Sequence, residues 1–242
     1  RQRRQFLRYA EMCRKALGHT RLYAYGRDEA PPEIIRTEQS SWLAAHEAGI
    51  GVFVASKAWR RQLFALDFIN LPGIPSPLRK IEADKFHESN PHALVGWYAD
   101  PHCGPENPDY FRRAHGLVAY KANYDVSANY ILWRNNWNDN AITDENWYRG
   151  IVTVLGGNGA FIHTLAYEGM REGLDDVRYA TRLKQLAAPA LEHADAKVRH
   201  LARRALSWLA YADERRESAG SIRMECIAFI LDLQDAAQGG AR

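Results

Sequence analysis

Two periodicities of hydrophobic and polar residues alternate along the first half of the chain. Apolar side chains recur every three or four residues in two stretches and predict helices at residues 6–17 and 33–48, and a polar stretch at residues 78–87 predicts a third helix. Short apolar runs rich in branched and aromatic residues predict strands between them, at residues 21–25, 51–55, 63–71 and 93–98. Strands that alternate with helices are typical of βα units, so we expect a parallel sheet whose strand carboxyl ends share one edge.

The pattern changes toward the C-terminus. A helix at residues 108–123 and an aromatic strand at residues 128–133 continue the alternation. After residue 159 helical spacing dominates and predicts three successive helices, at residues 167–187, 195–212 and 222–233. We therefore expect an α/β protein that ends in a helical tail.

Composition and charge exclude several classes of protein. The chain has 242 residues, of which 46% are hydrophobic and 25% charged, as in an ordinary globular protein. Its net charge of +3 is too small to indicate a nucleic-acid partner. The longest apolar runs are far shorter than the roughly 20 residues that a membrane-spanning helix needs, so we expect no membrane span.

Motifs for metals, cofactors and export are missing from the sequence. Cys13, Cys103 and Cys226 lie far apart, which indicates neither a zinc knuckle nor a disulfide framework. The histidines form no HExxH pattern, and the glycine-rich run at residues 156–159 lacks the spacing of a phosphate-binding loop. We expect no metal and no cofactor. No export signal is visible, and the missing initiator Met suggests an N-terminally truncated chain.

Two adjacent acids, Asp28 and Glu29, follow the first predicted strand and are the candidate catalytic residues. At the carboxyl end of a strand both side chains can point over the open edge of the sheet, where catalytic groups of βα enzymes lie. Each carboxylate opposes ionisation of the other, so one can stay protonated while its neighbour stays charged. A solvated turn that carries two acids would look the same in sequence.

Aromatic residues gather at the ends of later predicted strands. They are the candidate substrate-binding residues, together with one amide: Trp97, Tyr98, Trp133, Asn135 and Trp137. An aromatic ring offers an apolar plate to the C–H face of a sugar, and Asn can hydrogen-bond its hydroxyls. For any single Trp or Tyr, packing in the core is the competing interpretation.

The charged stretch at residues 167–179 contains Gly169 and Gly173 inside a predicted helix. Each glycine costs roughly 1 kcal/mol relative to Ala in a helix interior. Their presence therefore predicts that another element packs closely against this helix.

Three segments together resemble the C-terminal catalytic region of glycoside hydrolase family 123 and the related domain of unknown function 4091. They are YEGMREGLDDVRY at residues 167–179, NYILWRNNW at residues 129–137 and LYAYGRDEAP at residues 22–31. With the βα phasing between them, the resemblance covers about residues 20–186.

This resemblance implies the C-terminal portion of a (β/α)8 TIM-type barrel followed by an α-helical tail. The partial barrel would occupy residues 1–187, with the 4091-like segment at about residues 120–187. Residues 188–242 would form C-terminal helices packed on the barrel. Because only part of a barrel would be present, we expect its exposed edges to need the missing N-terminal half or a second copy as partner.

For the full-length parent protein, the resemblance also implies a glycosidase for β-linked N-acetylhexosaminides, with a retaining mechanism in which the substrate's own acetamido group is the nucleophile. Glu29 would be the general acid and then the base, and Asp28 would orient the acetamido N–H. Trp133 and Trp137 would wall the sugar ring, and Tyr98 would hydrogen-bond the acetamido group or a hydroxyl. The implied partner is a glycan or glycoside, and the implied location is extracytoplasmic. The alternative is a non-catalytic carbohydrate-binding or structural remnant of a barrel.

Overall fold

The computed structural model describes residues 2–57, 59, 63, 65–98, 107–128, 152–154 and 161–239. The chain divides into two compact units. The first unit comprises Arg1–Pro101 with Ala122–Asn129, and the second comprises His102–Lys121 with Tyr130–Arg242. The boundary expected after residue 187 falls inside one continuous helix, α6 (Leu165–Ala190), which belongs entirely to the second unit.

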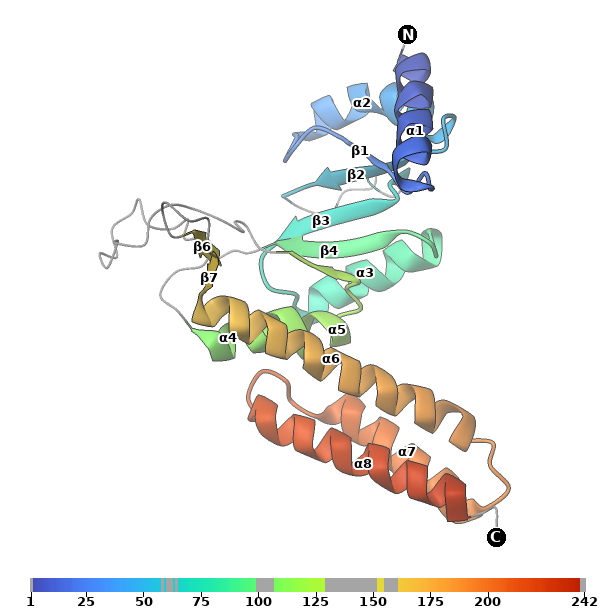
Figure 1. The fold of residues 1–242 in the computed structure, drawn as a ribbon, viewed down its shortest axis with the longest axis vertical. Helices are drawn as coiled ribbons and strands as arrows, with labels where there is room; N and C mark the ends of the chain where they lie inside the picture. The colour runs from blue at the N-terminus through green and yellow to red at the C-terminus, as the bar shows by residue number, and fades with distance from the viewer. Residues whose placement is uncertain are drawn as a thin grey trace, which may run out of the picture. The chain divides into compact units, whose positions relative to one another are not determined.

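A five-stranded sheet forms the first unit (Figure 1). Its strands are β1 (Tyr23–Tyr25), β2 (Gly51–Ala55), β3 (Phe68–Pro72), β4 (Leu94–Tyr98) and β5 (Val126–Ser127). They lie in the order β1-β2-β3-β4-β5, and every pair is parallel. The predicted parallel sheet is therefore confirmed.

Two strand boundaries differ from the sequence-based expectation. The strand predicted over residues 63–71 begins only at Phe68, because Leu63 and Leu66 are buried in a turn before it. The strand predicted over residues 128–133 lies almost entirely outside the described residues, and the fifth strand is found at Val126–Ser127.

The helices of the first unit are α1 (Gln2–Leu17), α2 (Pro32–His46) and α3 (Pro77–Ser89), all near the predicted positions. Gly18 ends α1 with φ +74°, a left-handed conformation that favours glycine, and its N–H donates to the Arg14 carbonyl at 3.0 Å. Ser76 caps α3 by accepting from the Arg79 N–H.

The two faces of the sheet differ in burial. Val54, Ile69 and Val95 are in register on one face and are almost completely buried. On the other face Phe53 and Phe68 stack with ring centroids 4.3 Å apart and remain partly exposed. One face of the sheet therefore forms the core of this unit, whereas the other is an incompletely covered aromatic surface.

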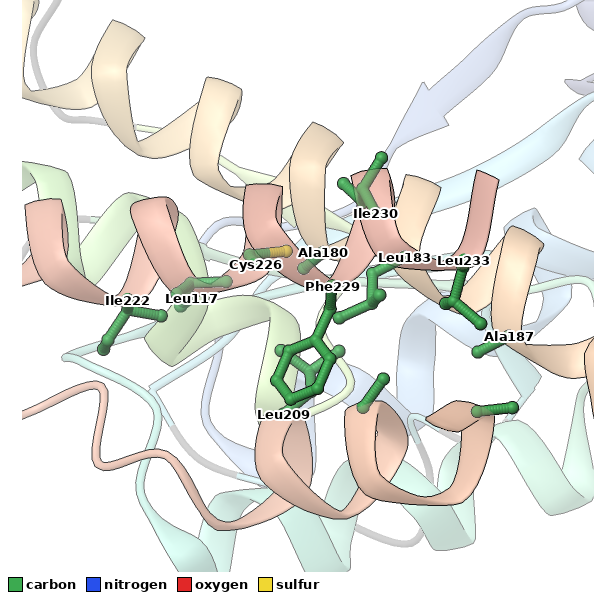
Figure 2. Packing of buried hydrophobic residues seen from close by; sticks show 12 residues of the cluster. Leu117, Ala180, Leu183, Ala187, Leu209, Ile222, Cys226, Phe229, Ile230 and Leu233 are labelled. Carbon is green, nitrogen blue, oxygen red and sulfur yellow. The ribbon is translucent and has the colours of Figure 1, made fainter. Parts of the chain in front are cut away.

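The second unit is mainly helical. A bent helical segment runs through α4 (Pro108–Arg113), the π-helical η2 (Ala114–Val118) and α5 (Ala119–Lys121). A two-stranded antiparallel sheet, β6 (Val152–Val154) and β7 (Phe161–His163), precedes α6, which is followed by α7 (Ala196–Tyr211) and α8 (Ala219–Gly239). The three long helices confirm the helices predicted after residue 159. Figure 2 shows their shared core, in which Leu183, Leu209 and Phe229 meet.

Close backbone packing explains the two glycines of α6. A Cβ atom at Gly169 would lie 2.2 Å from the Pro108 carbonyl oxygen, and one at Gly173 would lie 2.3 Å from the Arg112 carbonyl oxygen. Gly116 of η2 lies against Gly173 in the same way. The prediction that another element packs closely on this helix is confirmed, and that element is α4 with η2.

A buried ion-pair network joins three elements of the second unit. Asp176 of α6, whose side chain is only 3% exposed, accepts two hydrogen bonds from Arg112 at 2.7 and 2.9 Å. Arg223 of α8 donates to the same carboxylate at 2.5 Å and to Glu172 at 2.7 Å. The cations compensate the cost of burying Asp176, so this part of the predicted charged helix has a structural role.

Candidate functional site

The two candidate acids lie in the loop that follows β1, at the carboxyl end of the sheet. Two backbone hydrogen bonds tie this loop to β2: the Gly26 N–H donates to the Phe53 carbonyl at 2.8 Å, and the Glu29 N–H donates to the Ala55 carbonyl at 2.9 Å. Glu29 has φ +45°, in the left-handed region that residues other than glycine seldom adopt. The loop thus holds the Glu29 backbone in a strained conformation beside the end of β2.

The Glu29 carboxylate has two partners from neighbouring strands. Tyr98, the last residue of β4, donates its hydroxyl to Glu29 Oε1 at 2.5 Å. Lys57, which follows β2, lies with Nζ 3.1 Å from Glu29 Oε2. Both carboxylate oxygens are therefore engaged, one by a phenol and one by a cation.

These partners set the ionisation of Glu29. The Tyr98 hydrogen bond lowers the pKa of Glu29, partial burial opposes this, and Lys57 lowers the pKa further. Conversely, burial and the Glu29 carboxylate raise the pKa of Tyr98. At neutral pH Glu29 is thus a carboxylate and Tyr98 a neutral hydrogen-bond donor.

Asp28 is held differently. Its Oδ1 accepts a hydrogen bond at 2.6 Å from the hydroxyl of Tyr25, the last residue of β1. Among the described residues Asp28 forms no ion pair. The charges of Asp28 and Glu29 both raise the pKa of both tyrosines, which shows that all four groups belong to one electrostatic cluster.

The cluster lies on one edge of the sheet. Tyr25, Lys57 and Tyr98 belong to or follow strands that run in the same direction, and their carboxyl ends meet at this edge. In β3, Asn70 lies beside Gly96 of β4, two residues before the level of Tyr98; it is 7% exposed, and its Oδ1 has no hydrogen-bond partner among the described residues. The site therefore presents two carboxylates, two phenols and one ammonium group, with a buried amide beneath them.

The structure describes only part of the predicted substrate-binding set. Tyr98 lies in the cluster, but its neighbour Trp97 is fully buried. Successive residues of a strand point to opposite faces, so Trp97 packs in the core, and its predicted role in binding substrate is not supported. Trp133, Asn135 and Trp137 lie outside the described residues.

Sequence reasoning missed Lys57 and Tyr25. Lys57 is the second residue after the apolar run of β2, so it lies just past the carboxyl end of a strand. Asp28 and Glu29 were chosen as candidates because they lie in the same kind of position after β1. The same rule applied to every predicted strand would have found it. Tyr25 was assigned only to the strand, because nothing in the sequence shows that its hydroxyl reaches back to Asp28.

Within the described part of the chain, no group of three or more His, Cys, Asp or Glu side chains is placed to hold a metal ion. The helices of the described ranges also include none with the length and hydropathy of a membrane span.

Comparison with known proteins adds little to this geometry. No protein-family model matches the chain, and no curated protein sequence matches it. The crystal structure of SrfJ from Salmonella typhimurium is similar with a TM-score of 0.44 and 9% identity, over 69% of this chain and 45% of that chain. The chain thus spans less than half the length of SrfJ, and a similarity of this degree carries no conclusion about function.

Proposed function

We propose that this chain binds a glycan at the carboxyl edge of its sheet and hydrolyses a glycosidic bond there. The observation that carries the proposal is the convergence of Asp28 and Glu29, from one loop, with phenol and ammonium groups from two other strands. Carboxylates accept hydrogen bonds from sugar hydroxyls, and a pair of carboxyl groups is the usual machinery of glycoside hydrolysis. The partly exposed rings of Tyr25 and Phe53, 4.9 Å apart, offer an apolar surface beside them.

The arrangement of strands is compatible with a segment of a (β/α)8 barrel. In such a barrel all strands are parallel and neighbours in sequence are neighbours in the sheet. The five described strands follow this order without exception. We propose that the sheet is such a segment, which would make the partly covered aromatic face an inner face.

The chemistry we propose uses the substrate's acetamido group as nucleophile. Its carbonyl oxygen would attack the anomeric carbon while an acid protonates the leaving glycosidic oxygen, giving an oxazolinium ion that water then opens. A charged carboxylate that accepts the acetamido N–H stabilises the cation as it forms.

The lowered pKa of Glu29 helps to decide which of the two acids is the general acid and which is the charged carboxylate. A general acid must carry a proton at working pH, whereas Tyr98 and Lys57 favour the charged form of Glu29. We therefore assign the charged role to Glu29 and the acid role to Asp28, the reverse of what the family resemblance implies. Asp28 takes the acid role by elimination, since it is the other carboxyl group of the site and forms no ion pair in the described part of the chain.

The lowered pKa also favours one alternative, a non-catalytic sugar-binding site. A charged Glu29 with the Asp28 carboxyl group beside it and aromatic rings nearby can bind hydroxyls without donating a proton. In that case titration calorimetry would detect binding of a 2-acetamido sugar, while no product would be released.

Aryl 2-acetamido glycosides with different leaving groups test the proposal. A dinitrophenyl leaving group needs no protonation, whereas a phenyl group does. We expect Asp28→Asn to lose about 10²- to 10⁴-fold in turnover of the phenyl glycoside but far less with the dinitrophenyl glycoside. Glu29→Gln should lose activity with both substrates.

A matched control is Glu225→Gln, which removes an exposed carboxylate from α8 and should leave turnover unchanged. If Glu29→Gln shows the leaving-group dependence instead of Asp28→Asn, the two roles are reversed. If the unaltered chain hydrolyses neither glycoside, the catalytic proposal is wrong and the binding alternative is then tested by calorimetry.

A further inference from the structure

One buried amide of the sheet has no part in the reaction described above. The backbone of Asn70 is paired as in any parallel strand, since its carbonyl accepts from the Ser56 N–H at 2.9 Å. The residue is only 7% exposed, yet its Oδ1 accepts no hydrogen bond from the described residues. A buried polar group without a partner costs free energy, so its presence in a folded protein requires an explanation.

The amide lies on the face of the sheet that carries the acid cluster. Asn70 is in register with Gly96 of β4, and Gly96 comes two residues before Tyr98. Strand residues in register point to one face, and so do residues two apart in the same strand. Asn70 therefore faces the same side as Tyr98 and lies about 7 Å below it along the strand. The Tyr98 hydroxyl in turn holds the Glu29 carboxylate.

Gly96 makes room for this amide. A Cβ atom at Gly96 would lie 2.7 Å from Asn70 Oδ1 and 2.9 Å from the Phe68 ring. The oxygen thus occupies the space that a side chain at position 96 would take, beneath Tyr98 in the same strand. On the other side of Asn70 the residue in register is Ala55. Glycine and alanine carry no polar side chain, so neither neighbour in the sheet can pair with the amide oxygen.

We propose that Asn70 accepts a hydrogen bond from a hydroxyl of the bound sugar and is a specificity-determining residue of the site. This inference rests on the proposed function, in which the Glu29 carboxylate accepts the acetamido N–H of the same sugar. A hydroxyl is the donor that a sugar ring offers to a second acceptor, and it would supply the missing partner of the amide. A site built in this way rejects a sugar that lacks this hydroxyl, because the amide would again be buried unpaired.

Asn90 provides a matched control, because its amide has a structural partner. Its Nδ2 donates to the Leu66 carbonyl at 2.8 Å, before the start of β4 and thus toward the opposite edge of the sheet. Leu has the branched shape of Asn without its polar atoms. Asn90→Leu leaves a carbonyl unpaired, so it should lower the urea midpoint of unfolding and leave sugar binding unchanged. Asn70→Leu should do the reverse, with weaker sugar binding and no loss in the midpoint.

Titration calorimetry with N-acetylglucosamine and N-acetylgalactosamine measures the binding. We expect Asn70→Leu to lose about 10- to 100-fold in affinity for the sugar that the unaltered chain prefers. Asn70→Ala should lose as much, and it excludes an effect of the larger methyl groups of Leu. In a series of analogues that each lack one hydroxyl, one analogue should bind the unaltered chain equally weakly and lose nothing further with Asn70→Leu. That analogue identifies the hydroxyl that the amide binds.

Two results would overturn this inference while the proposed function stands. The first is that the unaltered chain binds the sugar and both variants of Asn70 bind it equally well, as they would if the amide held only a water molecule. The second is that Leu and Ala at position 70 destabilise the fold as much as the same changes at position 90, which would reveal a structural partner of the amide. If the unaltered chain neither binds nor hydrolyses a 2-acetamido sugar, the proposed function itself is wrong and this inference falls with it.

Discussion

The close approach of α6 to α4 makes a sharp prediction about glycine. In a solvated helix, Gly→Ala stabilises by up to about 1 kcal/mol. At Gly173, however, the new Cβ would lie 2.3 Å from the Arg112 carbonyl oxygen, where an ordinary contact is at least 3.4 Å. The two helices would have to separate by about 1 Å, and the obstructing atom is backbone that cannot rotate away.

The magnitude follows from these opposing effects. Overpacking of this kind costs about 3 kcal/mol and the gain in helix propensity offsets about 1 kcal/mol, which leaves a net loss of about 2 kcal/mol. For a protein of this size that corresponds to a fall in Tm of roughly 4–8 °C. Gly169→Ala should behave in the same way, because its Cβ would lie 2.2 Å from the Pro108 carbonyl oxygen.

Urea unfolding followed by circular dichroism at the helical band measures the loss, since α6, α7 and α8 contribute much of that signal. The control is Gly220→Ala near the start of α8, where the nearest atom to the new Cβ is a serine hydroxyl at 3.7 Å. It should be neutral or stabilising. If Gly173→Ala is as stable as Gly220→Ala, then α6 does not pack on α4 at the described distance and the argument fails.

Three further predictions concern ionisable groups. Tyr98→Phe removes the main cause of the lowered pKa of Glu29, so carbon-13 NMR titration of the variant should show a higher Glu29 pKa. The variant should also be about 0.5–1 kcal/mol less stable at neutral pH, after solvent screening. This difference should disappear as the pH falls through the pKa of Glu29 in the folded protein. Asp176→Asn breaks the buried network and should cost about 3 kcal/mol in urea unfolding, whereas a loss under 1 kcal/mol would contradict its burial. Burial lowers the pKa of His115 to about 4, so stability should fall by up to about 3 kcal/mol between pH 6.5 and pH 4, and His115→Gln should flatten that dependence.

Much of the fold could be predicted from the sequence because its elements are strongly periodic. The helix predicted over residues 33–48 and the strand predicted over residues 51–55 agree closely with α2 and β2. In both cases local pattern and tertiary burial favour the same element. The sequence pattern wrongly extends the third strand into the turn that precedes β3. Leu63 and Leu66 are buried there and continue the apolar run, but the backbone is not extended.

The candidate site was predicted less completely. The positions of Asp28 and Glu29 at a strand end follow from sequence order alone, and the structure confirms that both acids lie at the carboxyl edge. Their ionisation could not be predicted in this way, because it depends on Tyr98, which is 69 residues away in the chain, and on Lys57. Alternation along β4 could have separated Tyr98 from the buried Trp97.

The left-handed backbone of Glu29 sets protein stability against function. A side chain in this region of φ carries a strain of about 1 kcal/mol, which glycine would not. Glu29→Gly would release this strain but lose the hydrogen bond from Tyr98 and the ion pair with Lys57, so selection by thermostability alone would do little to retain the charged group on which the proposed reaction depends. Engineering of a more robust form of this protein should therefore hold position 29 fixed and seek its gains in the helical unit.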